Sequence, residues 1–347
     1  MALNLDLKKN NPLLSKVVQQ LDLIKNNLLL SKVVRHVALS KNLIFIAGAG
    51  ISCSGGIPDF KSSNGLFEMI NQKYPGSFHS VRDLFDANLH ISDNAVKAFY
   101  NFMGELNKLV LETEPIATHL FIKKLADMKK LKRVYTQNID NLEEKAGLEV
   151  WNFEKLKRYE SQVVQLHGTL ANLQCQLCTN VYSFTQKSCD IFIKGEIPNC
   201  PKCERRVVLY GDEHPNELEI GEIAKYDKKK ADCLLIMGTS LRIPEVKHLI
   251  KEFAKAVHKR KSYVIMVNDT NVVNKEWSRI IDYQIVATCD DWVNLVDNEL
   301  SNNKPQISKK RKRTKNDNQG RNEIVYQEKK IKVPSLNNKS SIKNKIK

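Results

Sequence analysis

Two Cys-x-x-Cys pairs are the clearest chemical signal in the sequence: Cys175 with Cys178, and Cys200 with Cys203. Four thiolates can close a tetrahedral shell around one metal ion, each at about 2.3 Å. A closed shell indicates a structural zinc ion (Zn2+), because catalytic zinc needs an open coordination position. Cys189 lies between the pairs and belongs to neither. We therefore expect one zinc ion in a small module inserted into the chain.

The glycine-rich stretch 48–67 follows the apolar run 43–47 and is a candidate phosphate-binding turn. Gly48 and Gly50 can adopt backbone angles closed to other residues and let a ligand approach the main chain. Glycines alone more often mark a plain turn, and the usual third glycine of a dinucleotide fingerprint is absent. Asp59 and Phe60, in a segment stiffened by proline, add a carboxylate and an aromatic ring beyond the turn.

Three polar side chains further along the sequence are candidates for chemistry at the same place. Asn138 and Asp140 are separated by one residue, so they can face a common pocket, although an Asx turn would use the same residues. His167 is a candidate general base, because histidine titrates near neutral pH and Gly168 leaves room beside it. A single histidine is more often structural.

Six short apolar runs, each ending in small or polar residues, predict the strands that position these groups. The runs cover residues 43–47, 131–136, 163–166, 232–237, 263–267 and 282–287. Helical periodicity appears over 94–111 and 118–130, and a mobile loop is expected over much of 69–105. The alternation predicts an α/β fold with a Rossmann-like, doubly wound parallel sheet, which collects ligand groups at the carboxyl ends of its strands.

Several of these motifs, in this order, resemble the sirtuin family of NAD-dependent protein lysine deacylases. The likeness runs from about residue 31 to residue 292 and includes these segments: Gly48–Phe67, Thr136–Asp140 (TQNID), His167-Gly168, Gly238-Thr239-Ser240 and Val267-Asn268. Residues 208–215 (VLYGDEHP) look most like the substrate strand of the fungal nuclear branch, which acts on histones.

The resemblance implies that NAD is a co-substrate, that His167 and Asn138 are catalytic, and that zinc is structural. The matching positions for NAD contacts are Gly48, Ala49, Gly50, Ser52, Ile57, Asp59, Phe60, Lys61, Gln137, Asn138, Ile139, Asp140, Gly238, Thr239, Ser240, Asn268, Asp269 and Cys289. In the family, the positions of Asn138 and Asp140 serve the nicotinamide end, and those of Ser240 and Asn268 serve the adenosine. Lys61 departs from the arginine that the family usually has there.

The implied reaction removes acetyl groups from lysine, expected on histones, and yields nicotinamide and O-acetyl-ADP-ribose. A role in chromatin silencing or genome maintenance would follow, with an acetylated protein or histone peptide as partner. Two alternatives remain: transfer of ADP-ribose to protein from the same NAD site, and a non-catalytic zinc-ribbon scaffold that binds nucleic acid. The presence of His167, Asn138 and Asp140 argues against the scaffold.

Charge and composition divide the chain of 347 residues. Of its net charge of +16, most lies in residues 301–347, which hold 15 Lys plus Arg against 3 Asp plus Glu. We expect this tail to be disordered and able to associate with chromatin. Its run 309–313 (KKRKR) fits a nuclear import signal as well as simple solvated charge, and the resemblance favours the nucleus.

The expected domains follow from these boundaries. Residues 9–18 nearly repeat as 25–34, which predicts an N-terminal helical extension over 1–30 that packs on the body or meets a partner. The catalytic domain is expected over 31–300, with a helical and loop insertion at about 61–110 and the zinc module at about 168–215. From the sequence we expect no export signal, and we expect no membrane span because no apolar run is long enough for one.

Overall fold

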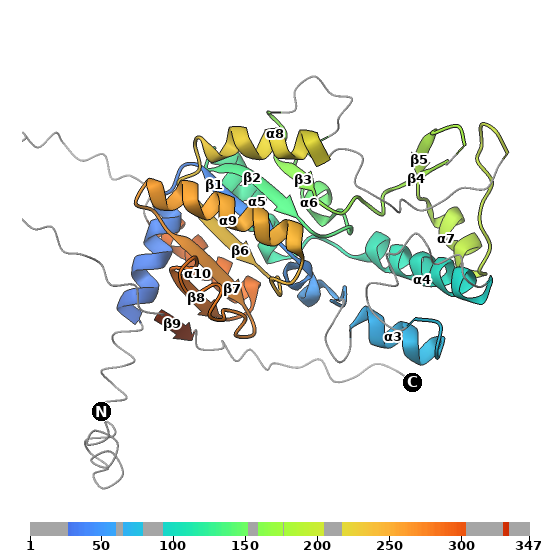
Figure 1. Ribbon diagram of the computed structural model, residues 1–347, viewed down its shortest axis with the longest axis horizontal. Helices are drawn as coiled ribbons and strands as arrows, with labels where there is room; N and C mark the ends of the chain where they lie inside the picture. The colour runs from blue at the N-terminus through green and yellow to red at the C-terminus, as the bar shows by residue number, and fades with distance from the viewer. Residues whose placement is uncertain are drawn as a thin grey trace, which may run out of the picture.

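A parallel sheet forms the centre of the protein (Figure 1). The computed structural model describes residues 27–59, 65–78, 93–151, 159–175, 177–204, 217–302 and 329–332. Within this part of the chain the sheet has seven strands in the order β3-β2-β1-β6-β7-β8-β9. Their bounds are Leu43–Ala47 (β1), Leu131–Thr136 (β2), Val163–Gln165 (β3), Cys233–Met237 (β6), Val264–Asn268 (β7), Tyr283–Val286 (β8) and Lys329–Lys332 (β9).

Both faces of the sheet are buried, which is why its strands are continuous apolar runs. In β1, Phe45 packs into the cluster on one face, whereas Ile44 and Ile46 pack into the cluster on the other. The first face is covered by a helix over 27–39, by α5 (Ala117–Asp127) and by α10 (Cys289–Asn302). The second face is covered by α8 (Glu217–Lys228) and α9 (Pro244–Lys259). This arrangement confirms the predicted doubly wound sheet.

A smaller lobe lies beside the sheet and has its own apolar cluster (Figure 1). It contains α3 (Leu66–Lys73), α4 (Asp93–Glu112), α7 (Gln186–Ile193) and the antiparallel pair β4 (Asn172–Gln174) and β5 (Val181–Ser183). Helices α4 and α7 touch at Gly104, where an added Cβ would lie 2.9 Å from the backbone nitrogen of Ile193. The short helix α6 (Leu142–Lys145) follows β2.

Three sequence expectations need correction. A helix, α3, occupies part of the expected loop 69–105, because Leu66 and Ile70 are buried one turn apart. Helix α5 ends at Asp127 rather than Lys130, since Lys129 has a left-handed backbone with φ of 57°. Most notably, β9 lies in the tail that we expected to be disordered, and it pairs in parallel with β8.

Other expectations lie outside the described residues. They include the first copy of the N-terminal repeat, the run 309–313, the segment 208–215, and the side chains of Phe60 and Lys61. The second copy of the repeat forms the helix over 27–39, as predicted. Among the described helices, none is both long enough and apolar enough to cross a membrane. The proposed domain boundaries remain predictions.

Candidate functional site

The glycine-rich turn lies where the strand order of the sheet reverses, between β1 and β6. Open parallel sheets bind ligands at this position, beyond the carboxyl ends of the strands. The turn after β1 forms the short 3-10 segments η1 (Ala49–Ile51) and η2 (Cys53–Gly55). The turn after β6 begins at Gly238, so the two turns lie side by side.

The glycines are needed for a different reason from the one expected. Gly48 has extended backbone angles, with φ of −131°, and Gly50 also has no left-handed angle. A Cβ at Gly48 would lie 2.7 Å from the carbonyl oxygen of Gly238, and one at Gly50 would lie 2.7 Å from Gly238 Cα. Of these three glycines, only Gly238, with φ of 62°, has the left-handed backbone that favours glycine. Close packing of the two turns therefore explains Gly48 and Gly50.

Three backbone N–H groups at these turns are available to a ligand. Within the described part of the chain, the N–H groups of Ala49, Thr239 and Ser240 donate no hydrogen bond, and Thr239 is 7% exposed. Ala49 is half-buried and Ser240 is exposed. N–H groups without a protein acceptor beside a glycine turn suit an anion such as a phosphate. The turns thus meet the requirements of a phosphate cradle.

A buried polar cluster lies next to the cradle, and it joins residues that are far apart in sequence. The Ser52 hydroxyl donates to Asp140 Oδ2 at 2.7 Å and accepts from Asn138 Nδ2 at 3.2 Å. All three residues are at most 4% exposed. Asp140 Oδ1 also accepts the backbone N–H of Leu142 at 3.1 Å, which fixes the carboxylate at the start of α6. Asn138 and Asp140 therefore meet at one hydroxyl, and their facing a common ligand pocket remains a prediction.

Two buried titratable residues beneath this cluster were not predicted. His119 Nε2 lies 3.5 Å from the Ser52 hydroxyl, and burial lowers the pKa of His119. Burial and then the charge of Asp140 raise the pKa of Glu143 to about 8. His119 Nδ1 and Glu143 Oε1 have no hydrogen-bond partner in the described structure. No sequence signal marks His119, whereas Glu143, three residues after Asp140 on a helix, could have been suspected.

His167 follows β3 at the same edge of the sheet and is exposed. Its Nδ1 lies 3.0 Å from the carbonyl oxygen of Gln137, which can only accept a hydrogen bond. The proton of the neutral ring is therefore on Nδ1, and Nε2 carries the lone pair that a general base needs. Gly168 has a left-handed backbone with φ of 77°, so this turn requires glycine for its conformation.

The side chains of Gln137 and Thr239 connect the ends of β2 and β6. Gln137 Nε2 donates to the carbonyl of Ala47 at 3.1 Å and to Thr239 Oγ1 at 3.0 Å. Ile57 and Ile139 pack against the apolar cluster of the smaller lobe. The carbonyl of Asp59 accepts the N–H of Leu66 at 2.7 Å, which holds the segment after the cradle against α3.

The remaining predicted contacts lie at the next strands along the same edge. Asn268 ends β7, and its Nδ2 donates to Asp269 Oδ1 at 3.1 Å and to Thr270 Oγ1 at 2.8 Å. Ser240 is exposed after β6. Cys289 begins α10, and burial raises the pKa of its thiol. The edge therefore carries a continuous line of polar groups from His167 to Asn268.

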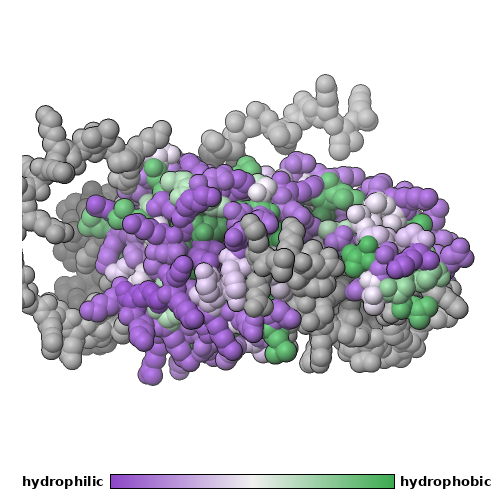
Figure 2. All heavy atoms as spheres, turned by 90° about the horizontal axis from the view of Figure 1, so that it is seen from above, coloured by the Kyte–Doolittle hydropathy of each residue, from purple (hydrophilic) through white to green (hydrophobic). Residues whose placement is uncertain are grey.

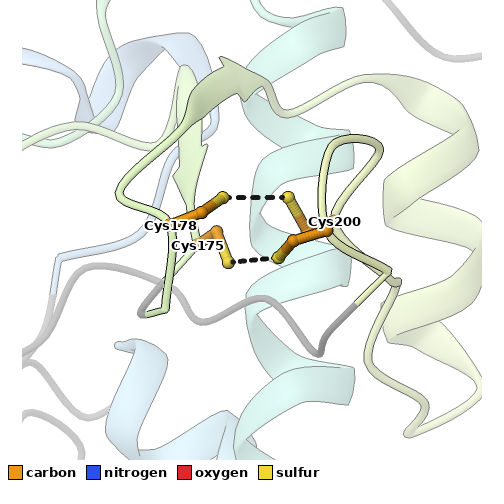
Figure 3. A group of neighbouring side chains, drawn as sticks. Cys175, Cys178 and Cys200 are labelled. Atoms are coloured by element: carbon orange, nitrogen blue, oxygen red, sulfur yellow. Dashed lines mark hydrogen bonds between the residues drawn. The ribbon is translucent and has the colours of Figure 1, made fainter.

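The four cysteines of the two pairs come together in the smaller lobe (Figure 3). The Sγ atoms of Cys175 and Cys203 lie 3.5 Å apart, and those of Cys178 and Cys200 lie 3.6 Å apart. A tetrahedral ion with metal–sulfur bonds of 2.3 Å would separate its ligands by about 3.8 Å. All four sulfur atoms lie within 4.8 Å of one another, so the group can bind one metal ion.

The local backbone explains why the sulfur atoms converge. Each pair lies in a turn closed by a hydrogen bond from residue i+4 to residue i: Thr179 N–H to the Cys175 carbonyl, and Glu204 N–H to the Cys200 carbonyl, both at 2.9 Å. Thr179 and Glu204 have matching left-handed angles, with φ of 55° and 57°. The backbone N–H of Cys178 lowers the pKa of Cys175 to about 6, which favours the thiolate that a metal needs.

A parallel α/β sheet with a glycine-rich turn at its reversal point, joined to a lobe with four clustered cysteines, is an architecture suited to nucleotide binding and to one structural metal ion. The chain belongs to the Sir2 family, whose pattern matches residues 48–245. It is 37% identical over 286 residues to the NAD-dependent histone deacetylase HST3 of Candida albicans, covering 74% of this chain and 59% of that protein.

Other relatives give a consistent result. The NAD-dependent histone deacetylase HST3 of Saccharomyces cerevisiae is 37% identical and is matched over 74% of this chain and 64% of its own length. The chain thus spans about three fifths of the length of these two relatives. A solved structure described as the structural basis for the mechanism and regulation of Sir2 enzymes is 27% identical, with a TM-score of 0.60, covering 79% of this chain and 98% of that one.

Proposed function

We propose that this protein is an NAD-dependent protein lysine deacetylase that acts on acetylated histones. One observation carries the proposal: the buried Ser52, Asn138 and Asp140 cluster lies between the phosphate cradle and the His167 turn. Membership of the Sir2 family and similarity to two HST3 proteins support the same function. The predicted NAD-contacting residues and catalytic residues are part of this proposal.

The cradle would hold the phosphates of NAD through the N–H groups of Ala49, Thr239 and Ser240. These groups have no partner in the described chain, and amides aimed at an anion bind it without a counter-charge. Asn268 and Asp269, at the end of β7, would bind the adenosine side. When bound, NAD supplies a ribose carbon that accepts the acetyl oxygen as nicotinamide leaves.

The buried cluster would orient the nicotinamide end of NAD and exclude water from it. Asp140 is fixed by two hydrogen bonds, from Ser52 and from the N–H of Leu142, so its carboxylate is held in one position. His167 would remove a proton from a hydroxyl group through Nε2, because its Nδ1 proton is engaged by the Gln137 carbonyl. Zn2+ on the four cysteines would be structural, since four thiolates leave no open position.

The proposed substrate, an acetylated histone, implies that the protein acts in the nucleus. A histone peptide carrying acetyl-lysine would enter between the sheet and the smaller lobe, and the protein would act in the nucleus. The basic segment 309–313 would serve as the import signal, and chromatin silencing or genome maintenance would be the resulting role. The similarity to named histone deacetylases supports this choice of substrate.

Mass spectrometry of an acetylated histone peptide, incubated with the protein with and without NAD, tests the proposal. We expect loss of the acetyl group only with NAD, together with release of nicotinamide and acetylated ADP-ribose. NAD labelled in its adenosine part separates this reaction from ADP-ribosyl transfer. Label that remains on protein, without loss of the acetyl group, would mean that the protein is an ADP-ribosyltransferase.

A further inference from the structure

Two basic triplets meet at the edge of the sheet opposite the cradle. Residues 228–230 (KKK) end α8 and precede β6, and residues 259–261 (KRK) end α9 and precede β7. Since β6 and β7 are neighbours and run in parallel, their amino ends lie side by side. Helices α8 and α9 also pack on the same face of the sheet (Figure 1). We call these six residues the basic edge.

The basic edge concentrates charge that the rest of the body lacks. Residues 1–300 hold 40 Lys plus Arg against 36 Asp plus Glu, a balance of +4. The six residues of the basic edge carry more positive charge than that, so the remainder of the body is slightly acidic. Seen from the α8 side, the surface over the sheet is mainly hydrophilic (Figure 2).

Among the described residues, most of these cations have no acidic partner. Lys229, Lys230 and residues 259–261 are exposed. In the described structure, Lys228 is the member of the basic edge that forms an ion pair, with Glu252 at 3.2 Å, and Lys255 shares that carboxylate at 2.8 Å. Cations near a helix C-terminus stabilise the helix dipole. That effect accounts for one or two positive charges per helix and not for two adjacent triplets.

The basic edge surrounds an open hollow of about 460 Å³. Its lining consists of Lys228, Lys229, Ala256, Lys259 and Arg260. Arg260 is positioned by hydrogen bonds from its guanidinium to the carbonyls of Ala256, at 3.1 Å, and of Lys229. Arg260 thus links the end of α9 to the end of α8 and holds the two triplets together.

We propose that the basic edge binds the phosphate backbone of duplex DNA without reading its sequence. Clustered cations are sufficient for such binding, whereas a protein partner usually needs a buried apolar or aromatic anchor. No residue that lines the hollow is a large apolar one. The basic edge and the cradle occupy opposite ends of the same strands, so DNA bound here leaves the candidate site accessible. This proposal does not depend on the proposed catalytic function.

Fluorescence anisotropy of a labelled 30-base-pair duplex, titrated with the full chain at several salt concentrations, tests the proposal. The patch variant combines Lys229→Gln, Lys259→Gln and Arg260→Gln. The matched control combines Lys187→Gln, Lys194→Gln and Lys275→Gln, which removes the same charge from exposed positions elsewhere. A second variant, Lys229→Arg with Lys259→Arg, keeps the charge of the basic edge.

We expect the patch variant to bind roughly tenfold or more weakly than the control, because it loses up to three phosphate contacts. The slope of log affinity against log salt should fall by about 2 to 3 in the patch variant, and the arginine variant should bind as the natural protein does. Equal affinity and slope in the patch variant and the control would overturn the proposal. So would weaker binding of poly-glutamate by the patch variant with unchanged binding of the duplex, which would identify an acidic protein as the partner.

Discussion

Glu143 and His119 are titratable residues whose burial beside the candidate site follows from tertiary packing and is not indicated by any local sequence pattern. Glu143 is fully buried beneath Asp140, and His119 is fully buried beside Ser52. His119 and Ser52 are 67 positions apart, and only the meeting of α5 with the cradle turn brings them together. A sequence reading can find pairs at one strand end, such as Asn138 and Asp140, because their spacing alone keeps them close together. It cannot find partners that tertiary packing supplies.

The raised pKa of Glu143 predicts a pH-dependent stability. Its folded pKa of about 8 exceeds the unfolded value of 4.5, so the folded state binds the proton more tightly. Stability therefore falls as pH rises from about 4.5 to about 8. The pKa of His119 is lowered from its usual value of 6.5. Its effect is therefore opposite: it lowers the stability of the folded state as pH falls below about 6.5.

Glu143→Gln should remove this effect, because glutamine cannot ionise. Between pH 6.5 and pH 8 the natural protein should lose up to about 2 kcal/mol of unfolding free energy more than the variant does. Urea unfolding at the two pH values measures the difference. Parallel pH profiles for the two proteins would show that Glu143 is not the group responsible.

At the scale of elements, the four-cysteine group of the smaller lobe was the easiest part to predict. The spacing of its cysteines implies four ligands, and the structure brings their sulfur atoms within 4.8 Å of one another. The strands of the sheet were predicted nearly as well: the run 131–136 coincides with β2, and the run 43–47 coincides with β1. Continuous burial on both faces leaves a clear apolar run.

Strand β9 could not be predicted, because Lys329–Lys332 has the composition of a solvated tail. Its place in the sheet comes from main-chain pairing with β8, which any sequence can supply at an open edge. Helix α3 was missed because its segment mixes polar and apolar residues beside turn formers.

Replacing Cys178 with Ser should release the bound metal, because serine is a poor ligand for zinc. The melting temperature should fall, since metal binding contributes directly to folding of this lobe. Metal content by mass spectrometry and thermal unfolding measure the two effects. Cys189→Ser, at a buried cysteine outside the four, is the control and should keep the metal. Full stability of a metal-free Cys178→Ser protein would contradict a structural role.

A buried ion pair connects β2 to α8 and gives a second prediction about elements. Arg133 Nε donates to Asp227 Oδ2 at 2.6 Å, both side chains are fully buried, and the hydroxyl of Tyr135 donates to the same oxygen at 2.8 Å. Asp227→Asn would leave the guanidinium buried without a counter-charge. We expect a loss of about 3 to 5 kcal/mol of unfolding free energy in urea.

The control for this buried ion pair is a pair of ion pairs at the surface, made by Glu276. Glu276→Gln removes the partner of Lys247 and Lys251 at the surface, at 3.1 and 2.8 Å, and should cost less than about 1 kcal/mol. If Asp227→Asn proved no more destabilising than Glu276→Gln, the buried network would not be what joins α8 to the sheet.

At the scale of the whole molecule, the C-terminal tail has two separable roles in this account. Truncation after Asn302 removes the basic run 309–313 and also β9. The melting temperature should fall by about 2 to 4 °C for each kcal/mol that the edge strand contributes. Turnover of a short acetylated peptide should persist, because the candidate site lies at the carboxyl ends of β1, β2, β3, β6 and β7 and not at β9. Nuclear accumulation should be lost.

Ile331→Pro distinguishes these roles, since it disturbs β9 and keeps every charge of the tail. Its melting temperature should fall as in the truncated chain, but its nuclear accumulation should remain. Loss of peptide turnover in the truncated chain would place the boundary of the catalytic domain beyond residue 302.

The central claim is that His167 is the base of an NAD-dependent deacetylase, and one comparison tests it most directly. Turnover of an acetylated histone peptide by His167→Ala is measured beside the natural protein and His248→Ala, a control at an exposed histidine on α9. The account predicts that His167→Ala binds NAD normally but deacetylates roughly 10² to 10⁴ times more slowly, while His248→Ala is unaffected. Undiminished deacetylation by His167→Ala, or no NAD-dependent deacetylation by the natural protein, would contradict it.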